Sequence, residues 1–229
     1  TTVPMPFWPW LQSHPFTGLI DAARGVSEVK WDGTMLFNGR EVRSTSLPWN
    51  YVPVWLVYTT PPAVLAGAIL SVGRLKDGVR GAFPVLVMWF AVLFPIVYVI
   101  LRGATIYDGI RQLLFVFPPL FVVAAIGWGW CLNALPSRIQ MIAACVLGLG
   151  LLEPVVFQVR NHPNQVVYFN HLIGGPSGAL QRFELDYWGN CHFQAMRQAG
   201  ALARQAGVPV VLSGPRWQQM MLNAPRIPQ

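Results

Sequence analysis

The fold is decided by residues 82–101, which read AFPVLVMWFAVLFPIVYVIL and contain no charged side chain. A helix needs about 20 mostly apolar residues to cross the hydrocarbon core of a bilayer, which is about 30 Å thick. Three other stretches are similarly poor in charge: the intervals Arg43 to Arg74, Arg111 to Arg138, and Arg138 to Arg160, the last with Glu153 as its single charge. We therefore expect an integral membrane protein.

The predicted fold is that of a mainly α, polytopic membrane protein with about four transmembrane helices and a small outward α/β appendage. Its helices are expected near residues 52–73, 82–101, 113–132 and 139–158. The first is the least regular, because Pro53, Pro61 and Pro62 interrupt it. Prolines are tolerated in spanning helices when neighbouring groups satisfy the freed carbonyls.

The orientation follows from positive charge in the short loops. Residues 74–81 carry three cations and one carboxylate, so this loop is expected in the cytoplasm. The chain then divides into an outward interfacial segment (1–50), a transmembrane part (51–158) and a non-cytoplasmic C-terminal α/β region (159–229). Residues 102–112 form an outward loop. We expect the protein in the bacterial inner (cytoplasmic) membrane, with both termini on the periplasmic side.

The two outward ends differ in pattern. Residues 1–50 are rich in Trp and Pro, which favours an interfacial segment with a short amphipathic helix around 17–29. Residues 191–206 show apolar side chains at helical spacing, and Gly207 is expected to end that helix. Residues 208–212 are predicted to form a short buried strand. The first 50 residues show no leader pattern, so we expect a longer chain to precede them.

Composition limits the partners. Charged residues make up 11% of the chain and the formal net charge is +7. The cations are scattered and do not alternate with aromatic residues, so nucleic acid is excluded as a partner, and an anionic membrane lipid or a phosphate-bearing substrate is favoured. The histidines His162, His171 and His192, with Cys191, match no metal-ligand spacing, and no metal-binding residue is predicted.

Four ordered stretches resemble one enzyme family. Residues 47–55 read LPWNYVPVW and are followed by TTP at 59–61. Residues 107–112 read YDGIRQ and lead into FVFPPL at 115–120. Residues 162–170 read HPNQVVYFN, with Gly174-Gly175 after them, and residues 183–189 read FELDYWG. In this order they resemble motifs of bacterial relatives of protein O-mannosyltransferases, which are integral membrane glycosyltransferases of the GT-C type.

The resemblance implies the C-terminal membrane part of a glycosyltransferase that takes a sugar from a polyisoprenyl-phosphate donor. The catalytic carboxylate of such enzymes lies in the first outward loop of the full chain, and the resemblance covers only the C-terminal part, so we expect that loop to lie outside residues 1–229. Whether this chain catalyses transfer therefore stays open, and no catalytic residue is assigned. No cofactor is established by the resemblance, and a divalent metal ion stays open.

The predicted substrate-binding residues are charged or aromatic and lie in the outward parts. Each also has a structural alternative. Arg102 and Arg111 suit a lipid phosphate or mark helix ends. Asp108 binds sugar or acceptor, or forms a turn with Gly109. Glu153 is an intramembrane acid or sits in a kink near water. The remaining candidates, which stack on a sugar or pack the appendage, are Asp186, Tyr187 and Trp188.

A second function class is a noncatalytic scaffold or accessory subunit of a larger membrane complex. Either function requires partners, because four helices leave apolar surface that other helices normally cover. We expect association with another membrane protein or with the N-terminal part of the same parent chain.

Overall fold

A computed structural model describes residues 12–14, 17–18, 20–21, 31–186, 189 and 191–208. The described part is mainly helical with one small sheet. Its named elements begin with the strands β1 (Thr34–Phe37) and β2 (Arg40–Arg43), continue through α3 to α8, and end with α9 (His192–Ala206).

Three helical stretches of the described chain are long and apolar enough to cross a membrane. The first, Pro62–Arg102, contains α4 (Pro62–Leu70), the 3₁₀ helix η2 (Ser71–Asp77) and α5 (Gly78–Arg102). The second contains η3 (Arg111–Val116) and α6 (Phe117–Ala134), and the third is α7 (Ser137–Arg160). The later three predicted helices are thus confirmed as helices, and a fourth span is not.

The predicted helix over 52–73 is wrong as a single element. The chain forms α3 (Tyr51–Thr59), breaks at Thr60 in an extended conformation, and resumes with α4. At nine residues, α4 is about 14 Å long, which is too short to cross a bilayer by itself. Pro61 and Pro62 cause the break, because neither has an N–H for the helical ladder.

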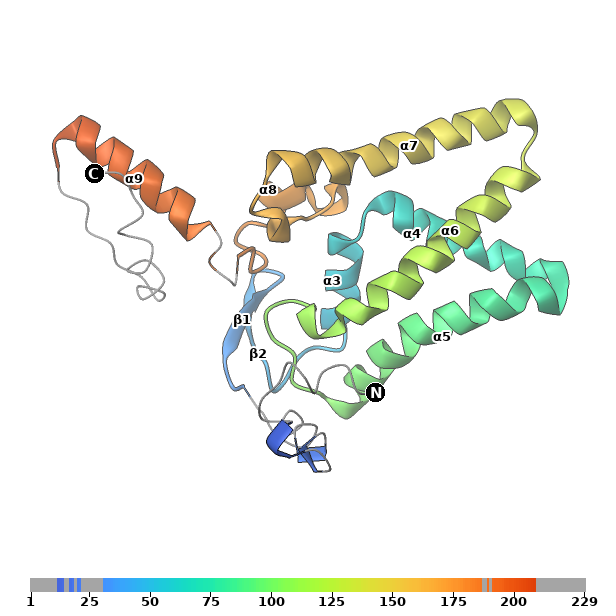
Figure 1. The fold of residues 1–229 in the computed structure, drawn as a ribbon, viewed down its shortest axis with the longest axis horizontal. Coiled ribbons are helices and arrows are strands. Elements are labelled where there is room, and N and C mark those ends of the chain that lie inside the picture. Colours follow the sequence, from blue (N-terminus) through green and yellow to red (C-terminus); the bar gives the residue numbers. More distant parts are fainter. Residues whose placement is uncertain are drawn as a thin grey trace.

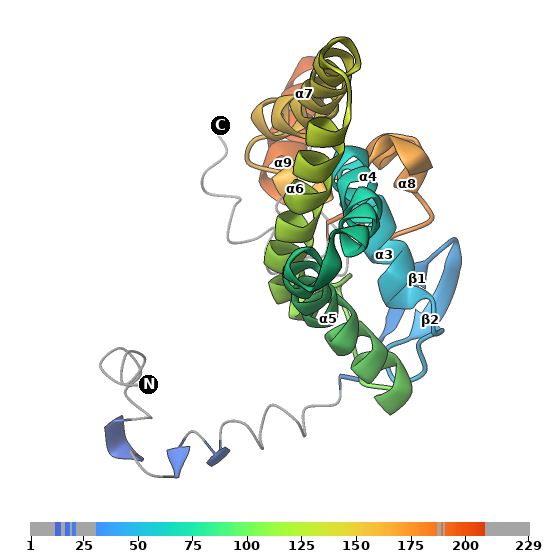
Figure 2. The same ribbon diagram turned by 90° about the vertical axis from the view of Figure 1, so that its right-hand side faces the viewer.

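The long helices run between two ends of the molecule. Figure 1 shows β1, β2 and α3 at one end, which we call the hairpin end, and the turns after η2 and α6 at the other, which we call the opposite end. Gly78, with φ 72°, ends η2 and lets the chain reverse into α5. Seen from the side in Figure 2, α4 and α6 run close together.

Glycines allow that close approach. A Cβ added at Gly127 of α6 would overlap the carbonyl oxygen of Gly67 on α4, and a Cβ at Gly67 would meet the Trp128 ring. Small residues at helix interfaces are the usual device for close packing in membranes. In contrast, none of the residues of α7 is buried, so this helix is attached to the bundle over a small area.

The sheet is a two-stranded antiparallel hairpin, which the sequence analysis did not predict. Thr34 pairs with Arg43 and Phe37 with Arg40. The turn is Asn38-Gly39, and both residues have positive φ (51° and 79°). This dipeptide is the preferred sequence for a type I′ hairpin turn, so the signal was present in the sequence.

An aromatic cluster joins the hairpin to the helices. Phe37 lies 5.0 Å from Tyr51 and 5.7 Å from Phe183 between ring centroids, and Trp55 lies 5.4 Å from Phe169. All five rings are buried. Arg182 also donates a 2.7 Å hydrogen bond to the Asn38 side chain at the turn. The core at the hairpin end therefore draws on four separate segments of the chain.

Three short elements follow α7: η4 (Gln165–Val167), η5 (His171–Ile173) and α8 (Gly175–Ala179). Further on, α9 confirms the predicted helix over 191–206, and Gly207 ends it with φ 66°. The strand predicted at 208–212 lies outside the described residues except for Val208. Most of the amphipathic helix predicted around 17–29 also lies outside them.

Candidate functional site

A compact polar cluster occupies the loop between α5 and η3 at the hairpin end. Nη2 of Arg111 lies 3.2 Å from Oδ2 of Asp108, and the two side chains are only 23% and 21% exposed. The Arg111 guanidinium carbon lies 4.6 Å from the centre of the Tyr107 ring, and the Trp31 ring lies 5.0 Å from the Tyr107 ring between centroids. The structure thus brings together two of the predicted residues, with two aromatic rings beside them.

The loop conformation follows from its sequence. Asp108 and Gly109 both have positive φ (55° and 73°), which Asp tolerates better than most residues and Gly adopts freely. Ile106 and Ile110 on either side are buried and fix the loop to the core. The Asp108 N–H donates to the sulfur of Met35 on β1 at 3.3 Å. Asp108 therefore both forms the turn and holds Arg111.

Arg102 stands apart from this cluster. It is the last residue of α5, is exposed, and forms no ion pair with any residue that the structure describes. Gly103 follows it in the left-handed conformation and ends the helix. A cation in this place complements the carbonyl end of the helix dipole.

Glu153 belongs to a second cluster, on α7. Its Oε2 accepts a 2.9 Å hydrogen bond from the Tyr168 hydroxyl, and its Oε1 lies 3.5 Å from Nε2 of His171. The Tyr168 ring also meets Phe157 edge to face, with 5.1 Å between centroids. An open cavity of about 500 Å³ runs along this face of the helix, past Glu153 and His171 to Arg160. The intramembrane carboxylate is therefore hydrogen-bonded.

Tyr168 acts as the donor in this pair. Burial, and then its hydrogen bond to the Glu153 carboxylate, raise the pKa of the Tyr168 phenol well above its ordinary value. The hydroxyl consequently stays protonated through the physiological range. Tyr168 was not among the residues predicted from the sequence, although it lies in the HPNQVVYFN stretch, and His171 was considered there only as a metal ligand.

Asp186 has a structural partner. One of its carboxylate oxygens accepts a 2.8 Å hydrogen bond from the backbone N–H of Cys191, just before α9. Burial, and then the neighbouring Asp186 carboxylate, raise the pKa of the Cys191 thiol to about 11. A protonated thiol is a weak nucleophile. Tyr187 and Trp188 lie outside the described residues.

Asn170 is a further residue that the sequence analysis missed. It is fully buried, and its Nδ2 donates to the carbonyl oxygens of Val57 and Thr60, both at 2.6 Å. Its backbone N–H donates to the Tyr58 carbonyl at 2.8 Å. In a continuous helix, Val57 and Tyr58 would accept from residues 61 and 62, which are prolines here. Asn170 therefore replaces the two donors that the prolines lack.

The two clusters lie on either side of the aromatic core. A Cβ added at Gly109, beside Asp108, would be in van der Waals contact with the Trp55 ring, and the same ring contacts Phe169, which follows Tyr168. Within the described ranges, no three His, Cys, Asp or Glu side chains gather as a metal site requires. The arrangement therefore presents the Arg111 guanidinium, held beside aromatic rings, and the hydrogen-bonded Glu153 carboxylate on the other side of the aromatic core.

Comparison of the chain with protein-family models, with curated proteins and with solved structures finds no match.

Proposed function

We propose that this chain is the C-terminal membrane part of a glycosyltransferase that uses a polyisoprenyl-phosphate sugar donor. The ordered motifs between residues 47 and 189 suggest the family. The observation that carries the proposal is the Arg111 cluster, because Asp108 and Tyr107 hold its guanidinium at the hairpin end of the membrane helices. A lipid phosphate would lie at such an interface, and preorganised cations stabilise it there.

The two arginines of the loop have different roles in this proposal. Arg111 binds the donor phosphate, because its planar fork is held by an ion pair and a ring contact. Arg102 is exposed and contributes long-range attraction. Asp108 orients Arg111, and Trp31 with Tyr107 offers apolar faces for a sugar ring. Glu153, hydrogen-bonded to Tyr168, is the candidate for contact with the acceptor.

The experiment is Arg111→Lys in the complete membrane protein of which this chain is the proposed C-terminal part. Lysine keeps the charge and loses both the fork and the planar contact with Tyr107. We expect donor-lipid affinity to fall about tenfold, which corresponds to about 1.4 kcal/mol. Arg102→Lys is the matched control and should bind donor almost as the parent protein does.

Donor binding is measured at equal expression, with the thermal midpoint of each protein recorded without donor. Unchanged affinity in a folded Arg111→Lys protein would refute the assignment of the loop to the donor site. An equal loss of donor affinity in Arg111→Lys and Arg102→Lys would show only a general effect of replacing arginine by lysine. It would also contradict the special role of Arg111.

A noncatalytic scaffold or accessory subunit is the second candidate, and α7 favours it. None of the residues of this helix is buried, although it is long and apolar enough to span a membrane. In either candidate, we propose that α7 packs against another membrane protein or against the N-terminal part of its own parent chain. Purification in mild detergent as a lone, monodisperse 25.5 kDa species would contradict this association.

The proposed setting is the bacterial inner membrane. In this arrangement, α4 and η2 together complete a fourth crossing, because they run from the hairpin end to the opposite end before α5 returns (Figure 1). The hairpin end, with both termini, then lies on the periplasmic side, where the donor sugar would be used.

A further inference from the structure

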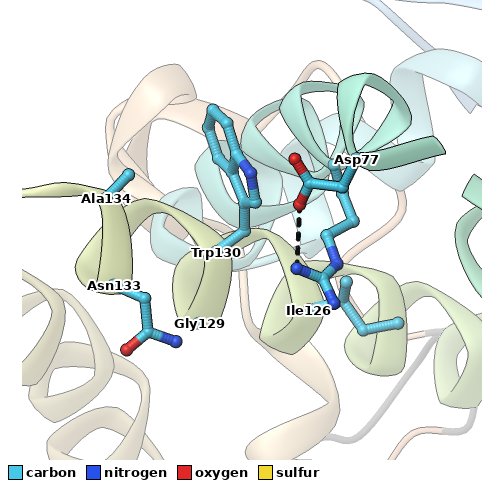
Figure 3. Close-up of a pocket in the computed structure, with 7 residues that line it drawn as sticks. Asp77, Ile126, Gly129, Trp130, Asn133 and Ala134 are labelled. Atoms are coloured by element: carbon cyan, nitrogen blue, oxygen red, sulfur yellow. Dashed lines mark hydrogen bonds and ion pairs between the residues drawn. The ribbon is translucent and has the colours of Figure 1, made fainter. Parts of the chain in front are cut away.

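A cavity of about 470 Å³ lies at the opposite end of the helices, away from both clusters described above. Figure 3 shows its walls: Trp130 and Asn133 extend from α6, and the dashed line joins Asp77 to the neighbouring Arg74 of η2. Ile126, one turn before Trp130, contributes an apolar side. The cavity is therefore charged toward η2 and mainly apolar along α6, where Asn133 adds one polar side chain.

An ion pair with Asp77 holds Arg74 in this cavity and leaves part of its guanidinium group available for a ligand. Its Nη1 donates to Oδ2 of Asp77 at 2.9 Å, and its side chain is 44% exposed. The structure gives Nη2 no hydrogen bond to any residue that it describes. Since a guanidinium carries five N–H donors in a rigid fork, the outer edge of Arg74 can bind a phosphate while Asp77 holds the inner edge.

The surrounding charge is strongly positive. Residues 71–80 and 133–140, all of which are described, contain four cations and one carboxylate. The cations are Arg74, Lys76, Arg80 and Arg138, and the carboxylate is Asp77. Lys76 and Arg80 are exposed and form no ion pair with the described part of the chain. An anion entering the cavity thus meets a net attraction.

The apolar side points to a lipid. Trp130 lies so close to η2 that a Cβ at Gly73 would overlap its ring, so the indole is held in place. Tryptophan is enriched at the level of lipid headgroups, and α6 below it is one of the apolar helices. A soluble phosphate would use only the cations, whereas a phospholipid would use the cations and the wall of Ile126 and Trp130.

We propose that this cavity binds the phosphate headgroup of an anionic glycerophospholipid, with the acyl chains along α6. Basic pockets between membrane helices are a known form of anionic-lipid recognition. A zwitterionic phosphatidylcholine headgroup fits less well, because its quaternary amine would lie near the Arg74 guanidinium, at an end of the molecule whose loops carry net positive charge. The site does not depend on the donor loop, which is at the other end of the molecule.

The test uses the full chain in nanodiscs of equal phosphatidylglycerol and phosphatidylcholine, with retained lipids identified by native mass spectrometry. The parent protein should retain phosphatidylglycerol in preference to phosphatidylcholine. Arg74→Gln should lower that retention about fivefold, the effect of one cation at a membrane surface. Arg43→Gln on β2 removes the same charge outside the apolar helices and should retain as much phosphatidylglycerol as the parent.

A second variant guards against misfolding of Arg74→Gln, since that change also unpairs Asp77. The double variant Lys76→Gln with Arg80→Gln alters only exposed side chains and should also reduce phosphatidylglycerol retention. Equal retention of the two lipids by the parent, or equal phosphatidylglycerol retention in all variants, would overturn the proposal. Displacement of the lipid by excess inorganic phosphate would do the same, since it would assign the cavity to a soluble anion.

Discussion

Single residues decide the local structure where the helical ladder cannot continue. Asn170 shows this at the α3–α4 break, where it satisfies carbonyls that Pro61 and Pro62 leave without donors. An unsatisfied carbonyl is costly when it is buried away from water. The stability of the break therefore depends on a side chain more than 100 positions away in the sequence.

Asn170→Ala should destabilise the protein by about 3 kcal/mol, because it leaves the Val57 and Thr60 carbonyls unpaired in a buried position. The midpoint of unfolding by added dodecyl sulfate in detergent micelles measures the change. Asn161→Ala is the matched control, since it removes one 2.9 Å bond to the Phe157 carbonyl at the end of α7. It should cost less than about 1 kcal/mol, and an equal loss in the two variants would contradict the special role of Asn170.

Cys191 should be alkylated slowly in the folded protein. Its thiol pKa of about 11 lies above the ordinary value, so the fraction of reactive thiolate near pH 8 is about a hundredfold lower than in a thiol of pKa 9. The rate with iodoacetamide should keep rising as the pH passes 9, while the same cysteine in the unfolded chain levels off there. Mass spectrometry of the Cys191 peptide follows both rates; a plateau at pH 9 in the folded state would refute the raised pKa.

The sequence identified some site residues and missed others for a physical reason. Asp108 and Arg111 were singled out because both belong to the YDGIRQ motif of one outward loop, but their ion pair was not predicted. The partners of Glu153 are 15 and 18 positions away in an irregular segment, and no periodic pattern relates them. The association of Asp186 with Cys191 also depends on a turn that the quoted motif does not predict.

Helices of this chain meet where their side chains are smallest. Gly67 and Gly127 bring the backbones of α4 and α6 into contact, and Trp128 closes the same interface by donating a 2.7 Å hydrogen bond to the Ala63 carbonyl. Lipid tails are as apolar as these helices, so close packing and hydrogen bonds carry the association.

Gly127→Ala should separate α4 from α6, because the new methyl group would overlap backbone atoms that cannot rotate away. Overpacking of this kind costs about 1–3 kcal/mol. Gly129→Ala on the same helix is the matched control, since nothing lies within 4 Å of its Cβ position. Alanine there should leave stability unchanged or raise it by up to about 1 kcal/mol. The same micelle unfolding measurement compares the two, and equal stability would refute the close contact.

Element boundaries were predictable where a long apolar run ends at a charge. The segments expected at 82–101 and 139–158 appear as α5 and α7, each within a few residues. The stretch 52–73 was wrongly predicted as one helix, because the length of its uncharged run was given more weight than the helix-breaking pair Pro61-Pro62. The β-hairpin was missed because the Trp- and Pro-rich composition of residues 1–50 obscured the Asn38-Gly39 turn.

At the scale of the molecule, charge separates the two ends of the bundle. The opposite end carries the cations of η2 and the start of α5, and the hairpin end carries the polar clusters and the sheet. Cationic short loops are retained on the cytoplasmic side. This asymmetry predicts which end faces the periplasm.

In a background with the three native cysteines changed to alanine, Thr45→Cys should react with an impermeant maleimide in intact cells. Lys76→Cys should react only after the inner membrane is permeabilised. Both positions are exposed, so the difference reports the side of the membrane. Gel-shift labelling measures it, and ready labelling of Lys76→Cys in intact cells would reverse the proposed orientation.

The segment from Tyr168 to His171 has a mechanical consequence. Its first and last side chains hold the Glu153 carboxylate on α7, and Asn170 between them holds the break between α3 and α4. These four consecutive residues thus connect α4 and α7, two helices that otherwise make few contacts with each other. A rotation of α4 about the break at Pro61-Pro62 would therefore move this segment. It would displace the Tyr168 hydroxyl and the His171 imidazole from the Glu153 carboxylate. The break between α3 and α4 and the Glu153 carboxylate are therefore mechanically coupled, so that a displacement at one changes the geometry at the other.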